Sequence, residues 1–322
     1  MSRDLSGYQT KIICDSTNGE GTRVTTFELQ MPKWLVAELN THRSVPAVTR
    51  QLARNSASSR AVPTSRIVAT IKNNPVYPTG WEPQEDFVDG LINNPVIPTD
   101  WRENTGGMQQ DTILSDATIT TLDYLWLRAR DSAINYAKRM LELKADKQRV
   151  NRMLEAWMWT KVVVTSTEWD AFFELRDHPA AQPEFGYIAH LMHKQYTSNK
   201  PQLAYWHMPY LLEDDALFDE HRNYLRGLKS TGRELTRLNT SLFAFLLISA
   251  ARCGRVTYYR QGETRDLLDD IQRGLSFANN KHWSPLEHCG RLMKNNRWYG
   301  PFFQFKSLRK YFPSECGKGR RR

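Results

Sequence analysis

The pattern of hydrophobic and polar residues predicts a chain that is mostly helical with a few short strands. Residues 23–29 alternate between the two classes and are rich in β-branched side chains, which is typical of a strand. Hydrophobic residues recur every three to four positions in three later segments, and so predict helices, at residues 121–143, 185–193 and 236–251. Regular strand–helix–strand alternation is not present, and no glycine-rich nucleotide-binding motif occurs.

Proline and serine content shapes the expectation for the first third of the chain. Pro32 can open a helix, and residues 33–43 then have helical spacing that places Arg43 at the C-terminal end. The serine-rich residues 54–60 are expected to follow as a loop. Residues 67–118 contain five prolines and predict an irregular insertion.

Composition indicates a globular protein with anionic partners. The 322 residues are 40% hydrophobic and 25% charged, with a net charge of +9, which favours nucleotides, folates or nucleic acid. The longest apolar run, residues 242–248, is too short to cross a bilayer, and no export signal is present. We therefore expect no membrane contact and a cytoplasmic location, that of the host if the protein is viral. The four cysteines are widely spaced and are expected to be free thiols.

Residues 41–60 concentrate hydrogen-bond donors suited to a phosphorylated ligand. His42 and Arg43 are followed by the sequence RNSASSR at residues 54–60. Arginine presents a planar fork of donors to phosphate, and serine and asparagine add neutral donors beside it. The alternative is that His42 caps helix carbonyls and that Arg43 lies on the surface.

Three further segments carry candidate chemistry. Residues 168–184 contain Arg176, for which the alternative to a binding role is an ion pair with Asp177 or Glu184. Two more segments follow, at residues 251–258 (ARCGRVTY) with 281–288 (KHWSPLEH), and at residues 298–310 (WYGPFFQFKSLRK). The last interleaves aromatic and basic residues, which fits either single-stranded nucleic acid or a hydrophobic strand with a basic edge.

Two other interpretations involve metal. His190 and His193 are three residues apart on an expected helix, with Glu184 as a third candidate ligand, and Glu287 precedes His288. We expect no metal at either place. A helix face near solvent explains the two histidines as well. At Glu287 and His288 the spacing is poor for zinc and no neighbouring Cys or His completes a set.

These segments together resemble the flavin-dependent thymidylate synthases. Residues 41–60 are similar to the signature R-H-R-x-x-S-x-N-x-x-S-x-R with a longer middle, and residues 168–184 to N-F-x-x-L-R followed by A-Q-x-E-I-R. Residues 251–258 and 281–288 resemble A-R-V-S-Y and H-x-S-P-x-E-H, and residues 298–310 resemble W-x-Q-Y-R-K. The later motifs follow the others, as in the phage-type members, whose motif order looks permuted.

The resemblance implies an α/β (α+β) fold, helix-rich with a mostly antiparallel sheet, as a single catalytic domain over residues 1–316 before a basic tail at 317–322. It implies FAD, NADPH and methylene-tetrahydrofolate as cofactors and co-substrates, and transfer of a one-carbon unit to C5 of a pyrimidine deoxynucleotide, with dUMP to dTMP as the leading reaction. It also implies a homotetramer whose sites are shared between subunits. No cysteine nucleophile is expected, since no Pro-Cys-His sequence occurs.

Position by position, the resemblance implies two sets of site residues. Those expected to contact FAD are His42, Arg43, Asn55 and His288. Those expected to hold the nucleotide are Ser58, Ser59, Arg60, Arg152 and Arg176. Arg60 and Arg176 are the expected catalytic residues, because guanidinium groups over the pyrimidine stabilise charge that develops on the ring.

Several positions depart from the family pattern. Thr41 replaces the first Arg of the signature, and Glu38 stands where a substrate-contacting Gln is common. Nine residues separate Arg43 from Ala53, where two are usual. Two alternatives therefore stay open: a related flavin-dependent methyltransferase or hydroxymethylase with another pyrimidine substrate, and a non-catalytic, basic nucleic-acid-binding protein on the same fold.

Overall fold

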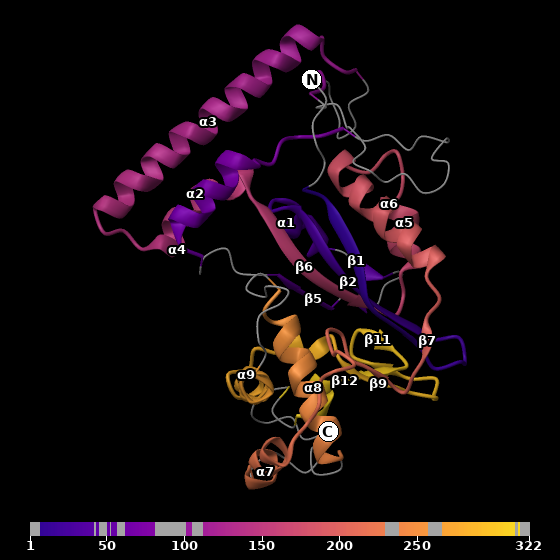
Figure 1. Cartoon of the computed structure of the whole chain (residues 1–322). Coiled ribbons are helices and arrows are strands. Elements are labelled where there is room, and N and C mark those ends of the chain that lie inside the picture. The colour runs from indigo at the N-terminus through magenta and orange to yellow at the C-terminus, as the bar shows by residue number, and fades with distance from the viewer. Residues whose placement is uncertain are drawn as a thin grey trace.

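The structure is a computed structural model, and it describes residues 7–41, 43–44, 50–51, 53–56, 62–80, 101–104, 112–228, 238–256, 266–312 and 315. Figure 1 shows a central sheet with two helices along one side, a group of helices that includes one long projecting helix, and a second lobe of helices and short strands at the C-terminal end.

The central sheet has five strands and is almost entirely antiparallel. Its strands, in sheet order, are β5 (Ala53–Ser56), β6 (Trp159–Ser166), β2 (Arg23–Pro32), β1 (Gln9–Thr17) and β7 (Gln202–Leu203). Only the short β1–β7 pair is parallel. The strand predicted over residues 23–29 is confirmed as β2, and the expected α+β class with a mostly antiparallel sheet is confirmed.

The turn between β1 and β2 depends on glycine and on one asparagine. Gly19 and Gly21 have φ angles of +75° and +94°, which an L side chain rarely adopts. The side-chain oxygen of Asn18 accepts hydrogen bonds from the backbone N–H groups of Glu20 and Thr22. These bonds satisfy turn donors that the strand ladder leaves unpaired.

The two faces of the sheet differ in chemistry because the strand residues alternate. One face carries Phe27, Leu29 and Val164, which pack in a core with helix α1 (Leu35–Leu39), α5 (Asp170–Arg176) and α6 (Pro183–Ser198). The opposite face carries Thr26 and Thr165, which are fully buried and are partners in the β2–β6 register. The sheet therefore separates an apolar core from a buried polar layer.

Two expectations for the first third of the chain are wrong in part. The helix expected over residues 33–43 is only the five-residue α1, Pro32 ends β2, and Arg43 begins the two-residue strand β3 (Arg43–Ser44), which pairs with β4 (Arg50–Gln51). The backbone N–H of Lys33 donates to the carbonyl of Met158 at 2.8 Å, so sheet pairing persists where a helix was expected to start. The expected loop over residues 54–60 is a strand as far as Ser56, because β6 offers an edge for it to pair with.

A group of helices packs beside the end of β6. It consists of α2 (Thr64–Asn73), α3 (Asp116–Glu142), α4 (Lys147–Val150) and the 3-10 helix η2 (Asn151–Trp157). The helix predicted over residues 121–143 is confirmed as α3, whose N-cap Ser115 accepts from the N–H of Thr118. The expectation of irregular structure over residues 67–118 is wrong at both ends, because α2 continues to Asn73 and α3 begins at Asp116. Helix α2 forms because Ile71 and its neighbours bury an apolar face against α3 and η2. Residues 81–100 and 105–111 lie outside the described part.

The C-terminal lobe encloses its own apolar core. Its elements are β8 (Trp206–His207), α7 (Asp219–Gly227), α8 (Thr240–Cys253), α9 (Leu267–Asn279), η4 (Ser284–Glu287), β9 (Gly290–Leu292), β10 (Trp298–Tyr299), β11 (Phe302–Phe303), β12 (Phe305–Ser307) and η5 (Leu308–Tyr311). Helix α8 confirms the helix predicted over residues 236–251, and α6 the one over 185–193. A Cβ on Gly274 would lie 2.5 Å from the carbonyl oxygen of Leu247, so α8 and α9 approach closely only because glycine is there.

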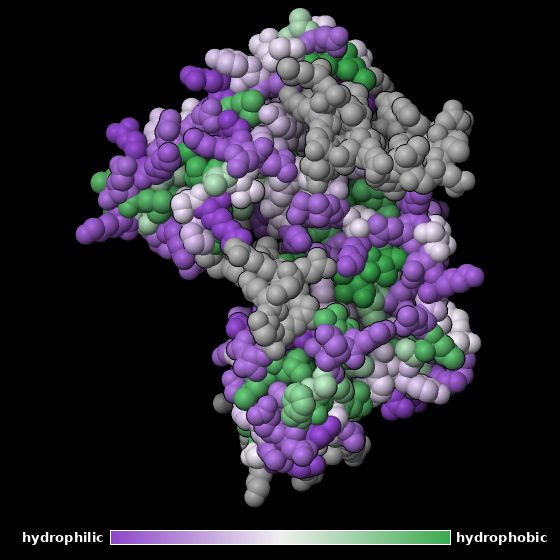
Figure 2. Space-filling model, viewed as in Figure 1, coloured by the Kyte–Doolittle hydropathy of each residue, from purple (hydrophilic) through white to green (hydrophobic). Residues whose placement is uncertain are grey.

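The surface is mixed in character. Figure 2 shows hydrophilic residues interrupted by hydrophobic patches, both over the helical group and on the C-terminal lobe. On α3, Leu125 is 54% exposed and Met140 is 42% exposed. Within the described residues, none of the helices is both long enough and apolar enough to cross a membrane.

Candidate functional site

Two sequence motifs that lie far apart in the chain meet at the edge of the central sheet. Strand β5, which belongs to the serine-rich motif, pairs with β6 so that Ala53 is opposite Thr165 and Asn55 is opposite Val163. The 3-10 helix η4, formed by the Ser284-Pro285 motif, packs against β5. The backbones of Asn55 and His288 are therefore brought to one edge of the sheet.

His288 lies directly after η4 and is completely buried. Its Nδ1 is 2.8 Å from the hydroxyl of Thr165, the same residue that stands opposite β5. Its Nε2 is buried and has no hydrogen-bond partner within the described part of the chain. A buried polar atom without a partner costs about 1–3 kcal/mol, so this nitrogen marks a position where a ligand atom would be stabilising.

Burial keeps this imidazole neutral. Loss of solvent, with a smaller contribution from the nearby ring of His207, lowers the pKa of His288 to about 3. Burial likewise lowers the pKa of His207 to about 3, against a smaller opposing effect of the Asp15 carboxylate. At neutral pH each ring therefore carries one N–H donor and one acceptor nitrogen.

Arg176 ends helix α5 on the other side of the sheet. Its Nη1 is 2.5 Å from Oε1 of Glu38, and its guanidinium lies over the ring of Phe185, 4.9 Å from the centroid. This carboxylate comes from α1, and sequence reasoning, which offered Asp177 or Glu184 for the ion pair, did not name it. The two positions at which the resemblance expects contact with substrate, 38 and 176, are thus in direct contact.

The arginine and the histidine occupy opposite faces of the sheet in one chain. Arg176 belongs to α5, whose Phe172 and Phe173 pack in the apolar core, whereas His288 contacts Thr165 on the polar face. A single copy of the described chain therefore does not place these two side chains around one ligand.

The other predicted site residues are less informative. Arg152 lies on η2, is 57% exposed, and is 3.5 Å from Glu155, so its ion pair is weak. Arg43 and Asn55 are placed by their backbones in β3 and β5. Four predicted residues lie outside the described part of the chain: His42, Ser58, Ser59 and Arg60.

Neither metal interpretation finds support in the geometry. Nδ1 of His193 and Nδ1 of His190 both bind the carboxylate of Asp177, at 2.7 and 3.1 Å. Glu184 accepts from the backbone N–H of Thr79 and from the amide of Gln182. Among the residues with described positions, no cluster of three His, Cys, Asp or Glu side chains is arranged to hold a metal ion.

Sequence reasoning missed several buried polar residues beside the site. His207 on β8 contacts Thr26 and Ser16, and Tyr210 donates to Glu28. These residues come from separate strands and carry no local motif. Thr26 falls at a polar position of the β2 alternation, like Glu28 and Gln30, so the sequence does not mark it as buried.

The cysteines are poor candidates for a nucleophile. Cys14, Cys253 and Cys289 are free thiols, as expected, and Cys316 lies outside the described residues. Burial raises the pKa of Cys289 to about 12 and raises the pKa of Cys14 and Cys253. The thiolate is the nucleophilic form, so burial suppresses thiol attack.

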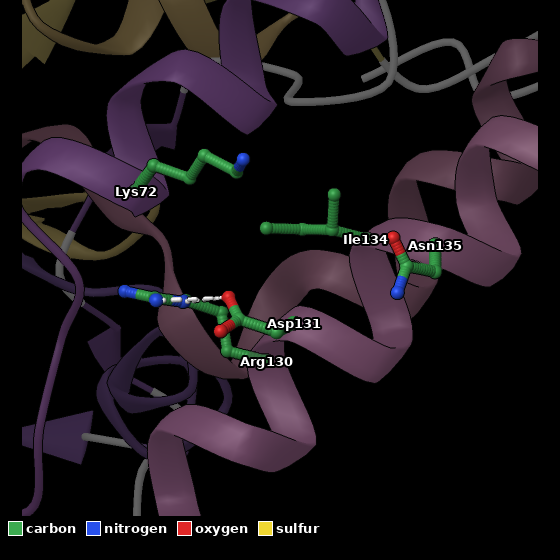
Figure 3. A pocket seen from close by; sticks show the side chains of 5 residues that line it. All are labelled: Lys72, Arg130, Asp131, Ile134 and Asn135. Atoms are coloured by element: carbon green, nitrogen blue, oxygen red, sulfur yellow. Dashed lines mark hydrogen bonds and ion pairs between the residues drawn. The ribbon is translucent and has the colours of Figure 1, made fainter.

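A separate hollow of about 300 Å³ lies between α2 and α3. Figure 3 shows Lys72 on one side and Arg130 on the other, with Arg130 paired to Asp131 at 2.8 Å. None of the site residues predicted from sequence lines it.

Comparison with known proteins gives matches among solved structures alone. No family model and no curated protein matches the chain. A UMP/dUMP methylase PolB from Streptomyces cacaoi bound with 5-Br dUMP aligns with a TM-score of 0.37 and 16% identity, over 54% of this chain and 66% of that chain. The same methylase bound with 5-Br UMP aligns with a TM-score of 0.39 and 15% identity, over 59% of this chain and 88% of that chain.

Proposed function

We propose that the protein belongs to the flavin-dependent thymidylate synthase-like enzymes and transfers a one-carbon unit to C5 of a pyrimidine deoxynucleotide. The leading reaction joins dUMP, methylene-tetrahydrofolate and NADPH to give dTMP, tetrahydrofolate and NADP⁺, with a proton taken up. The observation that carries the proposal is the meeting of β5 and η4 at one sheet edge, because these elements hold two motifs of the resemblance.

FAD would be held at this edge. Asn55 lies in β5, and His288 offers a buried Nε2 that lacks a protein partner among the described residues. His42 and Arg43 complete the set by resemblance. Bound FAD would supply the reducing hydride and relay the one-carbon unit, while the protein orients the reactants and excludes water.

The nucleotide would be held by Arg176, with Ser58, Ser59 and Arg60 on its phosphate and base by resemblance. Arg176 is already oriented by Glu38 and by the ring of Phe185, and about a fifth of its side chain is exposed. A guanidinium held in place would bind developing negative charge on the pyrimidine without reorganising.

A complete site would require more than one copy of the chain. Arg176, which would hold the nucleotide, and His288, which would hold FAD, lie on opposite faces of one sheet, so a second subunit would be needed to bring the nucleotide beside the flavin. This requirement supports a homo-oligomer with shared sites, of which the tetramer is the form that the resemblance implies.

Glu38 favours a second candidate, a related enzyme for another pyrimidine. Its carboxylate is an acceptor-only group, whereas the Gln common at this position both donates and accepts. The exocyclic amino group of cytosine could donate to Glu38, so dCMP belongs in the assay beside dUMP, with methyl and hydroxymethyl products both sought.

Two measurements test the proposal. Purified protein should retain added FAD after desalting and show the flavin absorbance bands. Incubation with NADPH, methylene-tetrahydrofolate and either dUMP or dCMP, followed by mass spectrometry, should reveal a nucleotide that has gained one carbon. Colourless protein that never retains FAD, and that binds single-stranded nucleic acid with a strong salt dependence, would instead establish the non-catalytic alternative.

A further inference from the structure

A three-stranded sheet in the C-terminal lobe has one face that points away from the central sheet. Its strands β8, β9 and β12 pair so that Trp206 and Lys306 both stand opposite Arg291, one on each side of it. Residues that stand opposite each other in paired strands project from the same face, about 5 Å apart. Trp206, Arg291 and Lys306 therefore form one row across the sheet, which we call the outer row.

The other face of this sheet is buried. The alternate positions His207, Leu292 and Phe305 are at most 2% exposed. Leu292 and Phe305 pack with Val24 of β2, and His207 contacts Thr26 of the same strand. The outer row thus faces away from β2 and from the buried polar layer, and its central arginine is exposed.

Two aromatic rings lie against the two cations of the outer row. The guanidinium carbon of Arg291 is 5.9 Å from the ring centroid of Trp206, and Nζ of Lys306 is 4.1 Å from that of Tyr311 in η5. The centroids of the two rings are 6.5 Å apart. A cation within about 6 Å of an aromatic centroid is attracted to the negative face of the ring. The row therefore presents positive charge and aromatic surface side by side.

The segment that contributes most of this sheet is strongly basic. Residues 281–312 contain one acidic residue, Glu287, and seven basic ones. The basic residues are Lys281, Arg291, Lys294, Arg297, Lys306, Arg309 and Lys310. Glu287 pairs with Arg309 at 2.6 Å. Arg291 makes no ion pair with any residue that the structure describes, so its charge remains available to an anion.

A row that combines cations with rings suits a ligand that alternates phosphates with flat rings. Arginine and lysine bind phosphate oxygens through charged donors, and an indole ring stacks on the face of a nucleobase. A duplex hides the faces of its bases in its own stack, and an acidic peptide would leave the ring face unused. Single-stranded nucleic acid uses both kinds of group.

We propose that the outer row binds single-stranded nucleic acid, with Arg291 and Lys306 on phosphate and the indole ring of Trp206 stacked on a base. This inference goes beyond the proposed function and does not rest on it. The outer row faces away from the central sheet, whereas His288 contacts Thr165 of that sheet, so one molecule can hold a flavin and a nucleic-acid strand at the same time.

The test is fluorescence anisotropy of labelled oligothymidylate and oligouridylate, titrated with the full-length protein between about 50 and 200 mM salt. At least one of the two strands is expected to bind, with a dissociation constant of about 1–100 μM at physiological salt, and more tightly than the matched duplex. The logarithm of the affinity should fall linearly with the logarithm of the salt concentration, with a slope of about −0.7 for each phosphate contacted. Absence of binding to both strands at low salt, or equal binding of the duplex, would overturn the inference.

Variants test the individual members of the outer row. Arg291→Gln and Lys306→Gln should each make the salt slope shallower by about 0.7. Trp206→Ala should weaken binding about five- to 150-fold with the slope unchanged, and Trp206→Phe should restore most of the affinity. Arg128→Gln is the matched control and should leave binding unchanged, because Arg128 is an exposed arginine of α3, which lies away from this lobe (Figure 1).

The outcomes separate the inference from the proposed function. Oligonucleotide binding that is unchanged in both Arg291→Gln and Lys306→Gln would overturn the inference, because the charge would then come from elsewhere in the chain. If Trp206→Ala fails to fold, these two glutamine variants still decide. Retention of FAD is measured on the same samples and should be the same in the parent and in Arg291→Gln. Protein that binds oligonucleotide through the outer row but never retains FAD would overturn the proposed function and leave this inference standing.

Discussion

Acid should destabilise this protein steeply, because two histidines are buried in their neutral form. The pKa of His207 and of His288 is lowered to about 3 in the folded state, whereas an unfolded histidine titrates near pH 6.5. Folded-state pKa values below the unfolded value give stability that is fully present above about pH 6.5. That stability is lost as the pH falls from there toward 3, because the two histidines bind protons in the unfolded chain but not in the folded chain.

The size of the loss follows from the two pKa values. Between pH 7 and pH 5 each histidine should lower the free energy of unfolding by about 2 kcal/mol, and the pair by about 4 kcal/mol. Domains are typically stable by about 5–15 kcal/mol, so the loss is large enough to measure.

The variant His207→Gln isolates one of the two contributions. It should be less stable than the parent at pH 7, yet its stability should fall by about 2 kcal/mol less between pH 7 and pH 5. Relief of the repulsion between the two rings acts in the same direction, because His207 lowers the pKa of His288. The Asp15 carboxylate, which opposes the shift at His207, remains in both proteins.

Urea denaturation at several pH values from 7.5 to about 4.5 provides the measurement. Ser249→Ala is the matched control: it removes a buried hydroxyl that donates to the carbonyl of Pro209 at 2.7 Å, so it should lower stability equally at every pH. If the free energies of unfolding of the parent and of His207→Gln fall in parallel between pH 7 and pH 5, the buried neutral histidine is not the source of the acid sensitivity.

Four further predictions concern other residues. Arg176→Ala should weaken dUMP binding by about 1.5–3 kcal/mol in calorimetry without unfolding the protein, and unchanged affinity would refute its role. Glu38→Gln should release Arg176 and tighten dUMP by up to about 1 kcal/mol, the net value of a partly exposed ion pair, and weaker binding would count against this reasoning. Cys253→Ser and Cys289→Ser should each keep turnover within about tenfold, whereas complete loss in a folded variant would indicate thiol chemistry. Arg252→Met removes the buried guanidinium that pairs with both Asp215 and Asp270, of which Asp270 keeps Arg255, and should cost about 3–5 kcal/mol in urea denaturation, so a loss below 1 kcal/mol would contradict it.

Elements with strong periodicity were predictable from the sequence. Strand β2 alternates from Thr26 to Met31, and α3, α6 and α8 repeat hydrophobic residues at helical spacing, so local patterns determine them. Strand β5 was mistaken for a loop because its residues have no strand pattern, and its pairing with β6 decides its conformation.

The candidate site was predictable only where its residues belong to motifs. His288 and Arg176 were selected from motif resemblance, and the structure gives each a specific environment. His207 was not selected, because its importance comes from contacts with Ser16 and Thr26, which are remote in sequence. A pattern read along the chain does not report which buried polar groups will face each other across a sheet.

The buried polar layer also bears on how the sheet assembles. A strand shifted by one residue exchanges its two faces, and most strands tolerate such a shift only at an exposed edge. In β2 a shift would move Phe27 into the polar layer and Thr26 into the apolar core, which would leave Nε2 of His207 without its partner and remove the hydrogen bond between Thr26 and Thr165. Each orphaned polar group would cost about 1–3 kcal/mol, so misaligned pairings are strongly penalised. The hydroxyls and imidazoles of the buried polar layer therefore also favour the native alignment of the strands during folding.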